Sequence, residues 1–394
     1  MIKQEYDVVV VGGGPAGTTA ARKAAEKGAT VALFHRNNEI GSPVRCAEGI
    51  ARKLLEKYIG KEKIKESWIA SEINQFRFIS PSLTKVDLNL KQTGYVLNRR
   101  IFDADLADWA TQAGVSIFSG AYVSGVEKSS DSSVVHVNHY GKEYRVKCKL
   151  VIAADGVESR IAEYFGLNTR LDPIDIDSCV QAYVSNIEMN ENRIDFWVSS
   201  QLAPGGYIWL FPKGRGKANI GIGISGAHNR DVNIRNNLEK FLAMHFPEAS
   251  IINYISGGVP IAMTLDTFVA DGLMVVGDAA RVANPTTGEG IAPALSTGTR
   301  AGIVAAKAVE KNDFSAKFLK DYEKDWQKDS GRFHKFYYNM KNVIYKIKDE
   351  EYDKLAEKFQ DRDPDSLTIR EIFGKLLWNK PKLLIDVARA FAGF

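Results

Sequence analysis

Six residues near the start of the chain have the types and the spacing that hold phosphate groups. They are Gly12-Gly13-Gly14-Pro15-Ala16-Gly17, and they lie between a β-branched run over residues 7–11 and an alanine-rich stretch that ends at Lys27. In a strand–turn–helix unit the first glycine makes the turn, the second lets the backbone approach a pyrophosphate, and the third permits close packing. Free N–H groups and the helix dipole favour negative charge there. We therefore predict that Gly12, Gly14, Pro15, Ala16 and Gly17 bind a dinucleotide, although similar turns also occur in βαβ units without a nucleotide.

The next apolar run, residues 30–34, predicts the second strand of this unit, and it ends on an unexpected residue type. An acid about 20 residues after the glycines normally binds the adenosine ribose, but here the chain has His35 and then Arg36. A neutral imidazole can accept a hydrogen bond from a ribose hydroxyl. Arg36 would favour a 2′-phosphate and therefore NADP, but the motifs further along the chain make NADP the less favoured cofactor. Both residues are predicted to bind the cofactor at its adenosine end.

A second glycine pattern, Gly221-Ile222-Gly223-Ile224-Ser225-Gly226, has a different interpretation. Its glycines alternate with isoleucines at period two, which predicts one pleated strand with a bare face and not a phosphate loop. A bare face admits a ligand or a close backbone. Gly221 and Gly223 are therefore candidates for a substrate site.

Two later segments each end a predicted parallel strand with an aspartate. Residues 150–154 run into Asp155-Gly156, with Ser159 and Arg160 close behind, and residues 273–276 run into Gly277-Asp278. The carboxyl ends of parallel strands are where open α/β sheets bind ligands, and an aspartate there can hold a ribose or ribityl hydroxyl. The second segment continues through Pro285 and Gly288-Glu289-Gly290-Ile291 into a small-residue helix predicted over residues 292–308, whose N-terminal dipole can face an electronegative group of the cofactor.

Taken in order, these three motifs resemble the fingerprints of the p-hydroxybenzoate hydroxylase-like FAD family. The resemblance implies that the first motif holds the ADP part of FAD and that Asp155-Gly156 lies close to the pyrophosphate. It also implies that Gly277-Asp278, Pro285, Gly288, Gly290 and Ile291 contact the ribityl chain and the flavin. One departure is that Arg160 follows Ser159 directly, whereas in the family an arginine usually stands two residues after the serine.

Finer features are similar to the archaeal digeranylgeranylglycerophospholipid reductases. They are the stretches Gly41-Ser42-Pro43-Val44-Arg45-Cys46-Ala47-Glu48-Gly49, Tyr95-Val96-Leu97-Asn98-Arg99, and Pro204-Gly205-Gly206-Tyr207-Ile208-Trp209-Leu210-Phe211-Pro212. The resemblance implies FAD contacts by Arg45, Cys46, Ala47, Gly49, Arg99 and Val123, with Cys46 facing flavin and substrate. It further implies that Tyr207, Trp209 and Phe211 line a lipid cavity, and that Cys46, Tyr207 and Trp209 form the catalytic set.

These residues also have simpler interpretations. Cys46 can be a small buried hydrophobe, although the adjacent Arg45 favours a thiolate or proton-donating role. Tyr207, Trp209 and Phe211 alternate, so they share one strand face, which core packing alone would explain.

The implied substrate is an isoprenoid glycerophospholipid. An isolated alkene has no carbonyl to polarise it, so its reduction needs a hydride, which reduced flavin supplies, and a proton. Two alternatives stay open: an FAD-dependent aromatic hydroxylase of the same fold, and a flavin-bearing lipid carrier without turnover. The electron donor is NAD(P)H or a reduced ferredoxin, which would be an electron-transfer partner.

Composition excludes several classes of protein. Hydrophobic residues make up 45% and charged residues 25% of the 394, as in ordinary globular proteins. The net charge of +4 is too small for a nucleic-acid-binding surface. The three cysteines, Cys46, Cys148 and Cys179, and the scattered histidines suggest neither a disulfide framework nor a metal site. We therefore expect a cytoplasmic protein, and because no stretch reaches the roughly 18 apolar residues of a membrane span, any membrane contact would be peripheral, on the inner face.

The elements that must position these residues predict an α/β fold: a Rossmann-like FAD-binding domain of the p-hydroxybenzoate hydroxylase type, an antiparallel substrate-binding sheet and a helical C-terminal region. The predicted bounds are 1–69, 95–175 and 261–310 for the FAD domain, 70–94 and 176–260 for the sheet, and 311–394 for the helices.

The C-terminal region contains a predicted amphipathic basic helix with Arg332, Lys335, Lys341, Lys346 and Lys348. Its lysine face is interpreted either as solvated or as a contact with anionic lipid. Residues 376–394 are apolar enough to cap the fold or to lie on a bilayer.

Overall fold

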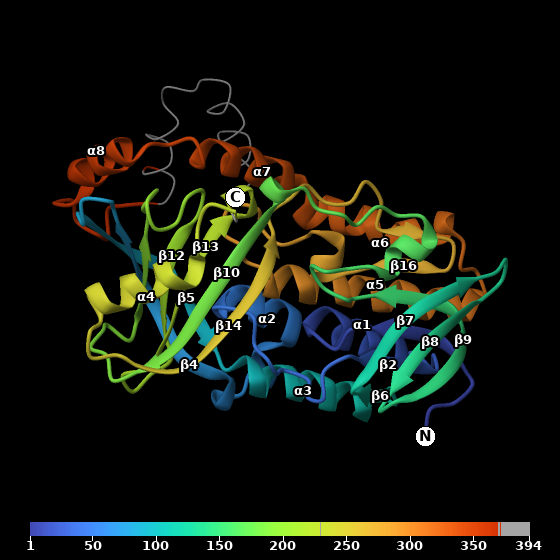
Figure 1. Cartoon of the computed structure of the whole chain (residues 1–394). Coiled ribbons are helices and arrows are strands. Elements are labelled where there is room, and N and C mark those ends of the chain that lie inside the picture. The colour runs from blue at the N-terminus through green and yellow to red at the C-terminus, as the bar shows by residue number, and fades with distance from the viewer. Residues whose placement is uncertain (229, 369–370, 372–394) are drawn as a thin grey trace. The chain divides into compact units, whose positions relative to one another are not determined.

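The computed structural model describes residues 1–228, 230–368 and 371, and it divides into two compact units. The first unit comprises residues 1–44, 99–171 and 262–334, and the second comprises 45–98, 172–261 and the described residues from 335 onward. Each unit is assembled from three separate segments and contains one eight-stranded sheet (Figure 1). Residues 376–394, predicted to cap the fold or lie on a bilayer, fall outside the described residues.

The first unit is built on a parallel sheet of buried β-branched strands. β1 pairs in parallel with β2 on one side and with β9 on the other, and Val8 is in register with both Val31 and Leu150. The order is β15-β16-β9-β1-β2-β6, with β7 and β8 joined to β9 as an antiparallel meander. The bounds are β1 Glu5–Val11, β2 Val31–His35, β6 Ser116–Ser119, β7 Ala121–Lys128, β8 Ser133–His139, β9 Lys142–Ala153, β15 Val269–Ala270 and β16 Leu273–Val275.

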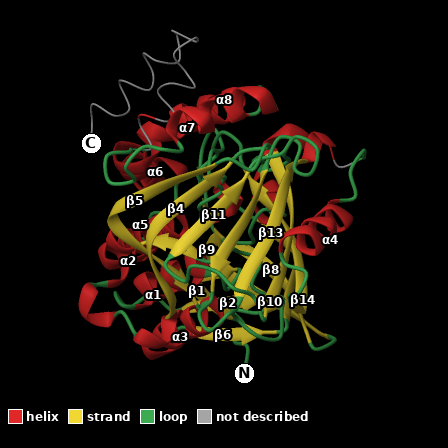
Figure 2. Ribbon diagram, turned by 90° about the vertical axis from the view of Figure 1, so that its left-hand side faces the viewer, coloured by secondary structure: helices red, strands yellow, loops and turns green. Residues whose placement is uncertain are grey.

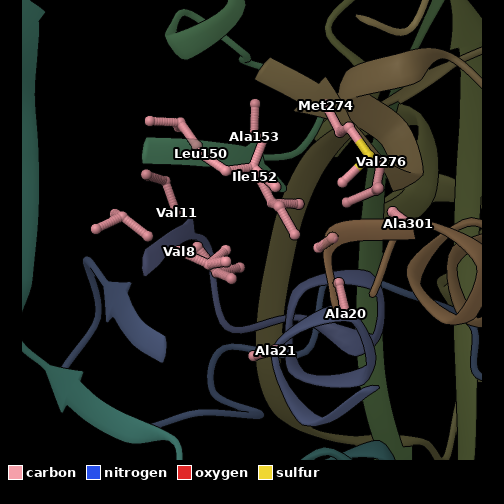
Figure 3. Close-up of a cluster of buried hydrophobic side chains, with 14 of the residues drawn as sticks. Val8, Val11, Ala20, Ala21, Leu150, Ile152, Ala153, Met274, Val276 and Ala301 are labelled. Carbon is pink, nitrogen blue, oxygen red and sulfur yellow. The ribbon is translucent and has the colours of Figure 1, made fainter. Parts of the chain in front are cut away.

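Helices complete the core of this unit, with α1 packed against α5 and α3 (Figure 1). Small residues allow the close approach, because a side chain at Gly298 of α5 would lie 2.3 Å from the carbonyl oxygen of Ala16. Figure 3 shows Val8, Ile152 and Met274 from three strands converging with Ala20 and Ala301 from the two helices, all fully buried. The bounds are α1 Pro15–Ala25, α3 Arg99–Gln112, α5 Ile291–Lys311 and α6 Ala316–Trp326. The predicted strand–turn–helix–strand unit is therefore confirmed.

The sheet of the second unit is antiparallel except where β11 pairs with β4. Its order is β14-β10-β13-β12-β11-β4-β5-β3. The bounds are β3 Gly49–Ala51, β4 Ile69–Ile79, β5 Lys85–Leu97, β10 Ile176–Ser185, β11 Arg193–Trp197, β12 Tyr207–Pro212, β13 Ala218–Ser225 and β14 Ser250–Pro260. β13 contains Gly221 and Gly223, so the prediction of a strand in place of a phosphate loop is correct.

The two faces of this second sheet have different coverings. α4 (Ile234–His245) packs against β10 and β13 (Figure 2), where Ile208, Ile220 and Ile222 form a core with Phe241. The opposite face contains the predicted substrate residues. The remaining α-helices of the described residues are α2 Arg52–Ile59, α7 Arg332–Ile344 and α8 Asp349–Phe359. Of these, α7 and α8, together with α6, confirm a helical C-terminal region.

The predicted basic helix forms only in part, as α7, which ends at Ile344 and leaves Lys346 and Lys348 outside it. The interpretation of its lysines as a solvated face is wrong for Lys341. That side chain is buried, and its Nζ donates to Asp175 Oδ1 at 3.1 Å and to the Ile261 carbonyl at 2.9 Å. It also lies 4.3 Å from the Tyr338 ring centroid. An ammonium group can be buried only when such partners replace its water. Lys335, Lys346 and Lys348 are exposed, as predicted.

Candidate cofactor and substrate sites

Backbone contacts at the glycine loop leave no room for side chains. Gly12 has φ +109°, and a Cβ there would lie 2.0 Å from the Ala154 carbonyl oxygen at the end of β9. A Cβ on Gly17 would lie 1.9 Å from the Gly12 carbonyl oxygen, so α1 starts directly against the loop. These contacts set the tight turn and the close helix packing that the motif requires.

Next to this crowded turn, the start of α1 is open. No described atom lies within 4 Å of the Cβ position at Gly14, and no side chain of that N-cap residue satisfies the first turn. Pro15 stands at the first helical positions, where its missing N–H costs nothing. Free N–H groups facing open space at a helix N-terminus form an anion site. The arrangement fits the pyrophosphate of a dinucleotide.

His35 lies at the end of β2 against the glycine loop. Its Nδ1 accepts the backbone N–H of Gly13 at 3.1 Å, which leaves the ring proton on Nε2. Nε2 is buried and has no hydrogen-bond partner of ordinary geometry within the described part of the chain, although the Glu39 backbone raises the pKa of the ring. Burial lowers the pKa of the imidazole, so the neutral form prevails. The predicted acceptor nitrogen is thus already used, and toward a ribose hydroxyl His35 can only act as a donor.

The neighbouring Arg36 points to a carboxylate. Its Nη1 donates to Glu158 Oε2 at 2.9 Å, and both side chains are exposed. The cation that could have selected a 2′-phosphate is therefore paired with an acid within the same unit.

The second motif closes on itself. The Asp155 carboxylate accepts the Ser159 hydroxyl at 2.9 Å and the backbone N–H groups of Arg160 and Ile161 at 2.8 and 3.0 Å. Gly156, with φ +80°, has open space where its side chain would be. Asp155 therefore holds its own turn, and a contact with a ribose or ribityl hydroxyl stays a prediction.

The third motif lies beside the first. A Cβ on Gly277 would lie 2.9 Å from the Ala16 Cβ, and one on Gly290 would lie 3.4 Å from Asp278 Oδ1. Burial raises the pKa of Asp278 to about 6, and the positive charge of Arg99 opposes the rise. Arg99 is held by two hydrogen bonds to Asp103, at 2.7 and 2.8 Å. The structure thus brings the three motifs and Arg99 together at one edge of the parallel sheet.

Glu289 is a member of this region that the sequence did not single out. Its carboxylate accepts the Ala292 N–H at 3.1 Å in the first turn of α5, and burial raises its pKa to about 7. The helix end that was predicted to face the flavin therefore has its own carboxylate. Pro285, Gly288 and Ile291 lie in or next to the same turn. Val123 lies apart from it, with its side chain in the hydrophobic core, so an FAD contact there would have to come from the backbone.

In the second unit, the loop that contains Cys46 is fixed by its neighbours. Cys46 Sγ accepts the Glu48 N–H at 3.2 Å. Glu48 has φ +77° and is buried, where its carboxylate pairs with Lys213 and accepts the Asn219 amide at 3.1 Å. This buried pair explains how a non-glycine residue holds a left-handed conformation. Beside Cys46, the stem of Arg45 lies 3.3 Å from the Cβ position of Gly257.

The predicted aromatic residues and the bare glycines face one another on β12 and β13. Trp209 is in register with Gly221 and Tyr207 with Gly223. A Cβ on Gly221 would lie 2.3 Å from Trp209 Cζ2, so the indole lies on the bare backbone. Phe211 in turn lies over Gly49, where a Cβ would be 2.5 Å from Cε1. Gly221 therefore accommodates a ring of the neighbouring strand, and a direct substrate contact at Gly221 or Gly223 stays a prediction.

Gln181 on β10 joins these two groups of residues. Its Nε2 donates to the Cys46 carbonyl at 3.1 Å, and its Oε1 accepts the Trp209 indole N–H at 3.1 Å. Gln181 is 7% exposed; its bond to Trp209 is buried and costly to lose, and its bond to Cys46 is partly buried. A single polar residue between Val180 and Ala182 in a strand was the only sequence signal for it.

The first unit has a parallel sheet, an open glycine loop at a helix N-terminus and acidic turns at the carboxyl ends of its strands. The second unit has a sheet with an aromatic face. Together these features define an FAD-dependent oxidoreductase of the α/β class. A family model described as FAD dependent oxidoreductase matches residues 7–195, and one described as geranylgeranyl reductase catalytic domain matches residues 175–259.

Relatives across the whole length make the family plain. The chain is 38% identical to digeranylgeranylglycerophospholipid reductase 1 of Methanococcoides burtonii, over 100% of this chain and 98% of that protein. It is also 38% identical to the digeranylgeranylglycerophospholipid reductase of Methanosarcina acetivorans, over 99% and 97%. This chain belongs to the digeranylgeranylglycerophospholipid reductase family, as the sequence motifs predicted.

Solved structures agree with this assignment. A geranylgeranyl bacteriochlorophyll reductase-like protein of Thermoplasma acidophilum has a TM-score of 0.89 and 35% identity, over 98% of this chain and 99% of that one. A flavin-dependent brominase shares the fold alone, with a TM-score of 0.73, 17% identity, and coverage of 98% and 99%. The predicted fold class and the use of FAD are confirmed.

Proposed function

We propose that this chain saturates isolated C=C bonds of geranylgeranyl chains on archaeal-type glycerophospholipids, with FAD as its bound cofactor. The observation that carries the proposal is the aromatic face of β12, which lies within the segment matched by the geranylgeranyl reductase catalytic domain. The names of the full-length relatives give the same substrate class.

The aromatic face suits an oily, unpolarised substrate. Ring centroids of Phe196 and Tyr207 lie 5.6 Å apart, those of Tyr207 and Trp209 5.8 Å, and those of Phe196 and Phe211 5.9 Å, all as edge-to-face pairs. Such rings offer large apolar area with only two rotatable bonds each. The protein contributes positioning and the exclusion of water, while reduced FAD, when bound, supplies the hydride.

The residues that would hold FAD fall into three groups. The open start of α1, from Gly14 to Gly17, would bind the pyrophosphate, and His35 would bind at the adenosine end. Asp278, in electrostatic contact with Arg99, would accept ribityl hydroxyls. Cys46 and Arg45 would contact the flavin, with Cys46, Tyr207 and Trp209 as the catalytic set.

The electron donor and the membrane contact are parts of the same proposal. NAD(P)H or a reduced ferredoxin delivers the electrons, and anaerobic titration with each identifies which. The protein acts in the cytoplasm and contacts the inner face of the membrane through the exposed cations Lys335, Lys346 and Lys348. No helix in the described part of the chain is long and apolar enough to cross a bilayer. Sedimentation with anionic vesicles, compared with neutral ones, tests the contact.

The deciding experiment uses the FAD-loaded protein, reduced without oxygen and then mixed with a geranylgeranyl glycerophospholipid. We expect the flavin to be reoxidised and the lipid to gain two hydrogens per flavin. The same lipid with saturated chains is the matched control and leaves the flavin reduced. Lipid binding without reoxidation would favour the carrier, and a hydroxylated product formed with oxygen would favour the hydroxylase.

A further inference from the structure

A buried acid lies beside the aromatic face of the second unit. Asp177 and Cys179 occupy alternate positions of β10, in register with Ser225 and Gly223 of β13. Alternate positions share one face, and Gln181, the next in this series, reaches Trp209 on that face. Tyr345, just after α7, donates its hydroxyl to Asp177 Oδ1 at 2.9 Å and lies 3.1 Å from Oδ2. We name Asp177, Cys179, Tyr207 and Tyr345 the Asp177 cluster.

Tyr207 belongs both to the aromatic face and to the Asp177 cluster. Burial raises the pKa of its phenol, and negative charge on Cys179, Asp177 and Cys46 raises it further. The strand register places them as neighbours, because Cys179 of β10 and Tyr207 of β12 are in register with the same residue of β13, Gly223. The acid therefore lies at the edge of the surface that we propose binds the isoprenoid chain.

Within the Asp177 cluster, only the carboxyl group can exchange a proton near neutral pH. Burial raises the pKa of Asp177 to about 7. Burial also raises the pKa values of Cys179, Tyr207 and Tyr345, which lie far higher to begin with. A general acid works best when its pKa is near the working pH, which singles out the carboxyl group.

The charged groups facing Asp177 are few among the described residues. Tyr345 hydrogen-bonds to the carboxylate and thereby lowers its pKa, and the Lys341 ammonium lowers it through its charge. Lys341 makes its own hydrogen bonds to Asp175 and to the carbonyls of Ile174 and Ile261. Among the described residues, the salt bridge of Lys341 is therefore with Asp175 and not with Asp177. Burial, which raises the pKa of Asp177, outweighs the lowering by Tyr345 and Lys341.

We propose that Asp177 supplies the proton for saturation of the double bond, an inference that rests on the proposed function. The O–H bond of the carboxylic acid breaks and a C–H bond forms at one alkene carbon, as a hydride from the reduced cofactor is added to the other carbon. The alkene gains two electrons and two hydrogens. The carboxylate of Asp177 then takes a proton from solvent.

The first test is Asp177→Asn in the FAD-loaded protein, followed by reoxidation of pre-reduced flavin on mixing with geranylgeranyl glycerophospholipid across pH. The wild-type rate is expected to fall as pH rises through about 7, because the acid must be protonated. The variant is expected to lose this pH dependence and to react about 100-fold more slowly, the lower end of what a general acid contributes. Asp195→Asn is the matched control: Asp195 is a buried acid of the same sheet, in register with Leu210 and so on the opposite face. It should leave the pH dependence unchanged.

The second test is Tyr345→Phe, which separates a chemical role from a structural one. It removes a hydrogen bond that favours the ionised carboxylate, so the pKa of Asp177 should rise and the falling limb should move to higher pH. The rate at pH 8 should then increase relative to wild type. A purely structural role for the Asp177 cluster gives a slower enzyme with an unmoved midpoint.

The protonation of Asp177 can also be measured without turnover. In flavin-free wild type, the infrared band of a protonated buried carboxyl group should titrate near pH 7 and be absent from Asp177→Asn. If the lipid does not reoxidise the flavin of the wild-type protein, the proposed function itself is wrong. Reoxidation with an Asp177→Asn profile like that of wild type would overturn only this inference. If Asp177→Asn does not fold, an unmoved midpoint in Tyr345→Phe overturns it.

Discussion

Replacing Gln181 should expose the linkage between the Cys46 loop and Trp209. In Gln181→Met, a side chain of similar length removes both hydrogen bonds: the buried Trp209 indole N–H loses Gln181 Oε1, and the partly buried Cys46 carbonyl loses the Gln181 amide. The buried N–H alone costs about 1–3 kcal/mol, so the free energy of unfolding should fall by at least about 1–3 kcal/mol. The loosened loop should also make Cys46 react faster with an alkylating reagent, while the buried Cys148 serves as the internal control.

Gln181→Glu tests the same two hydrogen bonds as a function of pH, because a protonated carboxyl group, like the amide, can both donate and accept. The ionised carboxylate still accepts from Trp209 but cannot donate to the Cys46 carbonyl. The protonated acid does both. Burial and the facing carbonyl would raise the folded-state pKa of the introduced carboxyl group above its unfolded value. Its stability contribution is therefore present at low pH and is lost as pH rises through the folded pKa.

The assay is urea unfolding of Gln181→Glu and wild type at matched pH between 4 and 8. The deficit of the variant should be about 2–4 kcal/mol at pH 8, from the lost hydrogen bond to the Cys46 carbonyl and a buried charge, and should shrink toward pH 4. A deficit that stays constant across this range would refute the hydrogen bond from Gln181 to Cys46. Trp209→Phe is the control, because it removes the indole N–H and part of the ring but introduces no titratable group, and so should show no such pH dependence.

Three further predictions concern single positions. Asp177→Asn should be more stable than wild type at pH 8 and equal to it below pH 4. The folded-state pKa of Asp177 is raised from 3.8 to about 7, so wild type loses up to ~4 kcal/mol of stability as pH rises through this window. Urea unfolding at the two pH values measures the difference. Gly221→Ala should cost about 1–3 kcal/mol by displacing the Trp209 indole, and less in a Trp209→Leu background, as thermal unfolding of the double-mutant cycle would show. Asp278→Asn should bind FAD more weakly than wild type above pH 6 and should abolish the loss of affinity that wild type shows as pH falls through about 6, measured by the fluorescence of released flavin.

Local patterns were enough to predict the tight glycine turn before α1 and the two facing strands. The contacts at Gly12 and Gly17 follow from a motif whose residues are neighbours in the chain, and the alternation around Gly221 describes a single strand. In both cases the physical requirement, a missing side chain, is written into the residue type itself. Such features need no knowledge of distant partners.

Long-range pairing limited the rest. Gln181 and the Cys46 carbonyl are 135 residues apart in sequence, and nothing in a lone strand glutamine identifies that partner. Lys341 fits an amphipathic lysine face by periodicity, yet Asp175 and two carbonyls bury it. His35 was judged by its ability to accept a hydrogen bond, whereas the Gly13 N–H decides which nitrogen holds the proton. In each case a partner from elsewhere in the chain changed the chemistry.

Because the indole of Trp209 lies on the bare backbone at Gly221, substitutions at positions 209 and 221 should be coupled in evolution. A methyl group can appear at position 221 only after the ring at position 209 has shrunk, and a smaller ring leaves a gap that only a larger residue at 221 refills. Across the lineage the two codons should therefore covary. Attempts to re-tailor the chain length of the lipid accepted should alter both in the same step.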